Sequence, residues 1–137
     1  MNYDELIYSY IKDNYFKILR EPGGQLRHKF IVPGACYDQC LWDWDSWLTD
    51  VAITQVAKNE GTLEEFFPYQ KGCIENLAEH ADPATGRLPI VVETASSMPP
   101  ASESGKITNA AKPVIIQHAI FIAKSQNEYE WLRPLYK

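Results

Sequence analysis

Apolar residues recur at steps of three and four along much of the chain, which is the spacing of an amphipathic helix. The pattern predicts five helices, over residues 3–19, 46–59, 64–80 and 113–125 and from residue 128 onward. Gly61 is expected to cap the second helix at its C-terminal end. Pro68 fits the third helix only if it lies in the first turn.

The segments between these helices lack a helical period. Short extended pieces are expected over residues 29–34 and 88–92, residues 37–44 are interpreted as a loop, and the Ser- and Pro-rich residues 94–108 as a long loop. The pattern therefore predicts an all-α fold for residues 1–137, organised as part of one domain.

The helix over residues 113–125 differs from the others because its apolar positions go nearly all the way round. A helix of this kind must be surrounded by other elements. Five helices in a chain this short would struggle to enclose one of them. We therefore expect its surface to be covered by the remainder of a larger domain or by self-association.

Composition narrows the classes of function. The chain has 137 residues, and its net charge of −5 argues against nucleic-acid binding, which needs clustered Lys and Arg. It has no apolar run of the roughly 18 residues needed to cross a membrane. The N-terminal residues do not resemble a signal peptide, and the three cysteines predict free thiols in the reducing cytoplasm.

Three of the four tryptophans fall within residues 42–47, where Trp42, Asp43, Trp44 and Asp45 alternate. Indole rings stack on the apolar faces of sugars, and neighbouring carboxylates accept hydrogen bonds from pairs of sugar hydroxyls. This pattern therefore indicates a sugar-binding segment. The alternative is that Asp45 is only a helix N-cap and the indoles belong to the core.

Residues 41–47 resemble the Trp-Asp-Trp-Asp-Ser segment of the six-hairpin glycosidases, the (α/α)6-toroid glycoside hydrolases that include trehalase-like enzymes. The branch of mannosylglycerate and glucosylglycerate hydrolases is the most similar. Residues 109–119 are similar to a Lys-Pro…Gln stretch that opens a later inner helix in that family, and residues 66–70 and 86–90 stand at the expected places. The resemblance covers about residues 25–135.

The resemblance implies an incomplete (α/α)6 toroid, with the second and fourth helices inside and the third and fifth outside. It also implies a sugar pocket at the N-terminal ends of the inner helices. The substrate-binding residues would be Tyr37, Trp42, Asp43, Trp44, Asp45, Lys112 and Gln117. Two of these have plain alternatives, because Gln117 could be a buried amide bonded to a neighbouring helix and Lys112 a solvated lysine.

The implied activity is hydrolysis of small α-glycosides, with α-glucosides, α-mannosides and glycosides of glycerate as candidate substrates. Glycoside hydrolysis needs two carboxylates on opposite sides of the bond. Asp43 and Asp45 approach from one side only, so no catalytic residue is assigned here and the acid and base are expected beyond this chain. No cofactor or metal is expected. The alternatives are a non-catalytic carbohydrate-binding module and an oligomeric helical protein.

Overall fold

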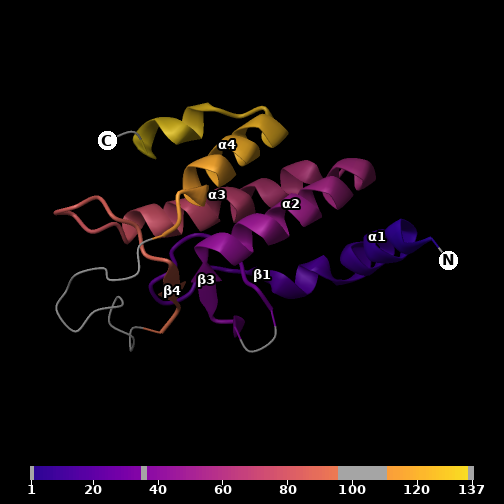
Figure 1. Ribbon diagram of the computed structural model, residues 1–137, viewed down its shortest axis with the longest axis horizontal. Helices are drawn as coiled ribbons and strands as arrows, with labels where there is room; N and C mark the ends of the chain where they lie inside the picture. Colours follow the sequence, from indigo (N-terminus) through magenta and orange to yellow (C-terminus); the bar gives the residue numbers. More distant parts are fainter. Residues whose placement is uncertain (1, 35–36, 96–110, 136–137) are drawn as a thin grey trace.

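The computed structural model describes residues 2–34, 37–95 and 111–135, and these residues are mostly helical. Helices α2 (Asp43–Glu60), α3 (Leu63–Glu79) and α4 (Val114–Gln126) pack against one another, and α1 (Tyr3–Asn14) lies at one edge beside α2 (Figure 1). The predicted helical fold class is confirmed at this level. The toroid stays a prediction.

The expected helix over residues 3–19 is shorter in the structure. Helix α1 ends at Asn14, and the 3-10 turn η1 (Tyr15–Ile18) follows it. The change coincides with a change of environment, because Tyr15 and Ile18 pack against the core whereas no residue of α1 is buried.

Two small antiparallel sheets flank the helices. Strand β1 (Leu19–Arg20) pairs with β2 (Phe30–Ile31), and β3 (Cys40–Trp42) pairs with β4 (Val91–Glu93). The extended pieces expected near β2 and β4 are confirmed. The loop expected over residues 37–44 is wrong in its second half, because β4 supplies a pairing partner from about 50 residues away that no local pattern reveals.

The main core lies where α2 and α3 meet β2 and β3. Its fully buried members come from all four elements: Phe30, Ile31, Leu41, Ile53, Cys73 and Leu77. The approach of β2 to α3 requires a glycine at position 72, since a Cβ there would stand 2.0 Å from the carbonyl oxygen of Lys29.

The ends of the helices agree only in part with the sequence-based expectations. Gly61 ends α2 in the left-handed conformation, as expected. Pro68 lies in the second turn of α3 rather than the first, and the helix continues because the carbonyl left without a donor belongs to the exposed Glu64. The helix expected from residue 128 is the 3-10 turn η3 (Glu130–Leu135).

Helix α4 buries one side and leaves the other open. Val114, His118 and Ile122 are buried against the neighbouring helices, whereas Ile116 is 64% exposed and Ile120 is 39% exposed. Across the described parts of the chain, none of the helices has the length and hydropathy of a membrane-spanning segment.

Candidate functional site

The candidate sugar-binding residues gather at the N-terminal end of α2. Strand β3 ends at Trp42, which caps the helix through its extended backbone, and α2 begins at Asp43. Asp45 is therefore the third residue of the helix and is exposed. The alternative in which Asp45 is the N-cap is wrong.

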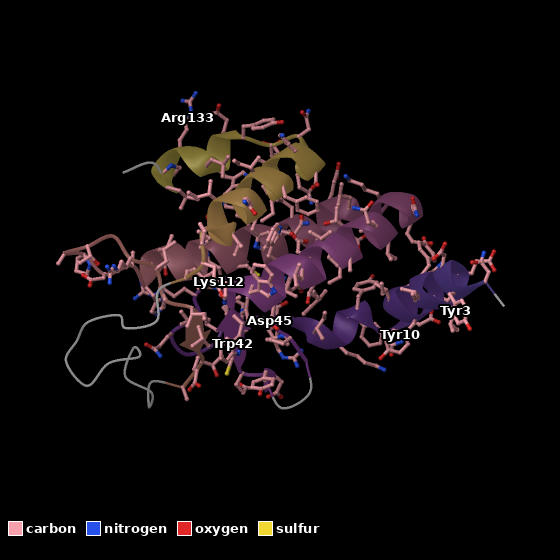
Figure 2. The ribbon with its side chains drawn as sticks, viewed as in Figure 1. Tyr3, Tyr10, Trp42, Asp45, Lys112 and Arg133 are labelled. Atoms are coloured by element: carbon pink, nitrogen blue, oxygen red, sulfur yellow. The ribbon has the colours of Figure 1, made fainter. Side chains whose placement is uncertain are left out.

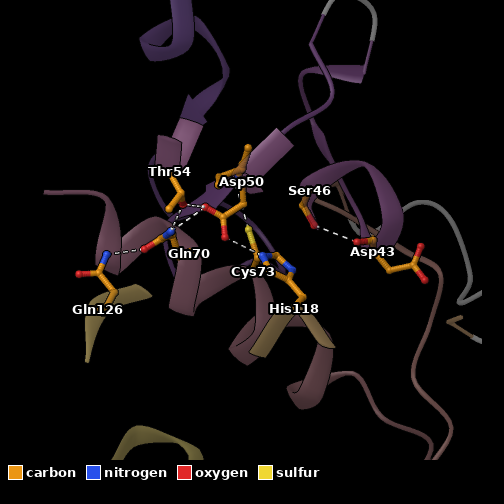
Figure 3. A network of polar contacts seen from close by, with 9 residues as sticks. Asp43, Ser46, Asp50, Thr54, Gln70, Cys73, His118 and Gln126 are labelled. Carbon is orange, nitrogen blue, oxygen red and sulfur yellow. Dashed lines mark hydrogen bonds and ion pairs between the residues drawn. The ribbon is translucent and has the colours of Figure 1, made fainter. Parts of the chain in front are cut away.

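Asp43 links this helix end to the segment that leads into α4. Its side chain is 2% exposed, and its two carboxylate oxygens accept the backbone N–H groups of Trp44 at 2.7 Å and Lys112 at 2.9 Å. The Ser46 hydroxyl donates to the backbone carbonyl of Asp43 at 3.2 Å (Figure 3). Asp43 therefore positions Lys112 next to the first turn of α2, and its own carboxylate is buried.

Two aromatic rings and one cation lie at the start of α2, which also carries the exposed Asp45. The Trp44 ring is partly exposed, meets the Trp47 ring edge to face at 5.8 Å, and lies 5.7 Å from the Lys112 ammonium. Figure 2 shows Lys112 and Asp45 near Trp42 at this end of α2. The arrangement places an indole platform beside a cation, and the exposed carboxylate of Asp45 follows Trp44 in the helix.

A second aromatic pair lies beside the first. The ring of Tyr37, half exposed, meets the ring of Trp42 edge to face at 6.0 Å. The indole nitrogens of Trp42 and Trp47 are buried without a hydrogen-bond partner in the described structure. Buried donors are nearly always paired in proteins, so these two N–H groups are exceptions to the usual pattern.

Gln117 behaves differently from the residues around Trp44. Its side chain is exposed on α4, so the alternative of a buried amide bonded to a neighbouring helix is wrong. Its contact with a ligand stays a prediction. The next residue, His118, is the buried polar residue of this helix.

His118 belongs to a polar network inside the helical core that the sequence analysis missed (Figure 3). Its Nε2 lies 2.9 Å from one oxygen of Asp50, and the other oxygen accepts from Gln70 at 2.6 Å and from Thr54 at 3.2 Å. The side-chain amide of Gln126 donates to the side-chain amide oxygen of Gln70 and extends the network to the end of α4. Asp50 and His118 are fully buried, so this carboxylate has a structural role in joining α2, α3 and α4.

One pattern in the sequence indicates a buried polar network on the helix over residues 46–59. Asp50 and Thr54 lie four residues apart in a helix whose neighbouring positions are apolar, so both fall on one face. Two polar residues on a buried face require partners from other helices. The pattern does not indicate which residues those partners are.

Cys73 is a core residue, and the described residues form no cluster of possible metal ligands. Cys73 is buried as expected, accepts the Ile31 backbone N–H at 3.3 Å, and burial raises the pKa of its thiol far above the ordinary range. Cys36, Asn109 and most of the expected loop over residues 94–108 lie outside the described residues. Within the described ranges, no group of three or more His, Cys, Asp or Glu side chains is arranged to hold a metal ion.

Comparisons with known proteins do not extend this description. Scans of the chain against protein-family models, curated proteins and solved structures found no match.

Proposed function

We propose that this chain forms the sugar-binding part of a glycoside hydrolase that acts on small α-glycosides, with α-glucosides, α-mannosides and their glycerate derivatives as the candidate substrates. In this proposal the described helices belong to an (α/α)6 toroid. The general acid and the second carboxylate come from residues beyond this chain, and the protein works in the cytoplasm.

The observation that supports the proposal is the first turn of α2, where a partly exposed indole lies beside a lysine and an exposed carboxylate follows in the helix. Trp44 provides an apolar face, Asp45 follows it in the helix, and the Lys112 ammonium lies 5.7 Å from the Trp44 ring. A sugar ring has the complementary chemistry, because its C–H groups stack on indole while its hydroxyls bond to charged groups.

Each residue then has a distinct role. Trp44 stacks on the sugar, Asp45 accepts hydrogen bonds from two neighbouring hydroxyls, and Lys112 donates to an oxygen of the sugar or of an acidic aglycone. Trp42 and Tyr37 form the adjoining wall, and Gln117 is kept as a more distant contact. Asp43 positions Lys112 and is not proposed to bind the sugar directly, because its carboxylate is buried.

The expectation that Asp43 and Asp45 approach a ligand from one side is wrong, because both belong to α2 and residues two apart in a helix point in different directions. Asp43 is buried, so within the described cluster Asp45 is the carboxylate that can reach a ligand. One accessible carboxylate can hold a sugar, but cleavage needs a second group on the opposite side of the bond.

Calorimetric titration with methyl α-mannoside, methyl α-glucoside and an α-glycoside of glycerate tests the binding role. We expect binding that Trp44→Ala and Asp45→Asn each weaken by roughly tenfold or more, the loss expected for one good contact. Glu64→Gln is the matched control, since Glu64 is an exposed acid in the first turn of α3. No binding of any glycoside, or equal effects of Asp45→Asn and Glu64→Gln, would contradict the proposal.

Cleavage of a bound glycoside by a longer protein would distinguish a hydrolase from a non-catalytic binding module. If sequence beyond Lys137 supplies two carboxylates and the longer protein cleaves a bound glycoside, the hydrolase is supported. Binding without cleavage by the longer protein would instead support a non-catalytic carbohydrate-binding module.

A further inference from the structure

The segment between β1 and β2 lies against α3 and is held there at His28. The backbone N–H of His28 donates to the side-chain oxygen of Asn76 at 3.1 Å, and the Asn76 amide donates to the His28 carbonyl oxygen at 3.0 Å. Asn76 is fully buried, and Gly72, one turn earlier in α3, leaves room for the carbonyl of Lys29. The backbone at His28 is therefore fixed on α3 by contacts that do not titrate.

The His28 ring adds two contacts of a different kind. Its Nε2 lies 2.9 Å from a carboxylate oxygen of Glu79, and its Nδ1 lies 3.3 Å from a carboxylate oxygen of Glu75. A neutral imidazole has one N–H and one acceptor nitrogen, whereas the imidazolium has two N–H groups. Only the protonated ring can therefore donate to both carboxylates, because the neutral ring sets a lone pair against one of them.

The charges on α3 make the same distinction. Glu75 and Glu79 lie four residues apart on the helix, where two like charges repel each other. Lys71 pairs with the second oxygen of Glu75 at 3.1 Å. With His28 protonated, two cations face two carboxylates, whereas with His28 neutral Lys71 alone faces them.

The other charged groups near the ring do not replace the imidazolium. Lys29 pairs with Glu21 at 3.0 Å, and Arg27, the preceding residue in the chain, is exposed. Nδ1 of His80, at the end of α3, lies 2.8 Å from the backbone carbonyl oxygen of Asn76. The charge that faces Glu79 therefore comes from His28.

We propose that His28 is a pH-sensitive contact that holds residues 23–28 on α3 when its ring is protonated and loosens them when the ring loses its proton. Histidine side chains ordinarily change charge between about pH 5 and 8, where carboxylates are ordinarily ionised. The contact contributes most on the acid side of this range, and its contribution falls as the pH rises. This inference does not depend on the proposed sugar site.

The same segment connects His28 to the end of β4. The Gln25 backbone N–H donates to the Thr94 carbonyl oxygen at 3.2 Å, and the Gln25 side-chain amide donates to the Glu93 carbonyl oxygen at 3.3 Å. Gly24 is required beside this contact, since a Cβ there would overlap the Thr94 carbonyl. Loss of the His28 ring contacts should therefore loosen the Gln25 amide, which lies between α3 and β4.

Amide hydrogen exchange of the 137-residue chain at about pH 5.5 and 8, corrected for the intrinsic rate, tests the proposal. We expect protection at Gln25 to fall by about threefold at the higher pH relative to amides in α2, the effect of losing one partly exposed ion pair. His28→Gln, which cannot gain the charge, should remove this fall. His80→Gln is the matched control, a half-buried histidine that faces a carbonyl, and it should retain the fall.

Nitrogen-15 NMR of the His28 ring in the wild-type chain makes the test independent of any variant. Both ring nitrogens should be protonated where protection at Gln25 is high, and protection should fall together with the loss of the ring proton. Circular dichroism confirms that each variant is folded. Protection that stays constant while the ring titrates, or a fall that persists in His28→Gln, would overturn the proposal.

Discussion

The middle of α2 and its two ends all carry acidic side chains, yet the structure uses them in different ways. Asp50, in the middle, is fully buried and has partners on both oxygens from three helices. Asp45, near the start, is exposed. Glu60, the last residue of α2, is also exposed and binds Tyr8 and Lys12 of α1. The comparison shows that the saturation of the carboxylate oxygens, more than helix position, separates a structural acid from one available to a ligand.

Removing the interior carboxylate should produce the largest effect. Asp50→Ala leaves His118, Gln70 and Thr54 buried without their shared acceptor. We expect a loss of about 3–5 kcal/mol in the free energy of unfolding, because each buried polar group left without its partner costs about 1–3 kcal/mol. Urea unfolding followed by circular dichroism measures it.

Asp50→Asn sharpens this test because it retains one acceptor oxygen and the side-chain shape. We expect it to be less destabilising than Asp50→Ala. If Asp50→Ala unfolds at the same urea concentration as the wild-type chain, the network does not hold the three helices together.

Loss of the Asp43 carboxylate should have an intermediate effect. Asp43→Ala leaves the backbone N–H groups of Trp44 and Lys112 without their acceptor, and we expect a loss of about 1–3 kcal/mol. Hydrogen exchange at the Lys112 amide should accelerate more than exchange within α3. Uniform acceleration across all helices would mean that Asp43 supports the whole fold and has no local positioning role.

The Glu60 contact should make the stability of α1 depend on pH. Hydrogen bonds from Lys12 and then Tyr8 lower the pKa of Glu60 below 4.5, so the contact stabilises α1 above that pH and is lost as the pH falls through the lowered value. The same pairing raises the pKa of Lys12 above 10.5, so its contribution is complete below that pH and is lost as the pH rises through the raised value. Amide exchange in α1 should therefore be slowest, after correction for the intrinsic rate, between these limits.

Glu60→Gln provides the control for this pH dependence. It should loosen α1 at neutral pH and remove the acid-side change. An acid-side change in α1 that persists in Glu60→Gln would assign the effect to another group.

Asp45→Asn should have the smallest effect on stability and a large one on binding. Asp45 is exposed, and exposed substitutions of this kind leave stability almost unchanged. Its urea midpoint should match that of the wild-type chain while glycoside binding falls. A clear loss of stability would place Asp45 with the structural acids and would remove the contrast with Asp50.

Helical periodicity predicted the main helices because their packing faces are local features of the sequence. The cap at Gly61 was predicted for the same reason. The 3-10 turns at Tyr15–Ile18 and Glu130–Leu135 were expected as α-helix, since their apolar spacing is similar and tertiary packing decides between the two forms. Strand β3 was missed because its partner, β4, is distant in the sequence.

The proximity of the two candidate segments was predictable from the sequence, but the environment of each side chain was not. The sequence placed Trp44, Asp45 and Lys112 together, and the structure brings Lys112 to the Trp44 ring. The sequence did not show which of Asp43 and Asp45 is buried. Burial depends on the segment at residue 112, which reaches α2 only in the folded structure. His118 was missed for the same reason, since its partner lies 68 residues earlier.

The separation between Asp50 and His118 has a consequence for the order of events during synthesis. The ribosome releases α2 and α3 well before α4, so the Asp50 carboxylate has no imidazole partner for the 68 residues between them. A carboxylate in that state favours water over a closed core. The helices are therefore expected to reach their final packing only after α4 has emerged, and loop closure over this distance should slow that last step.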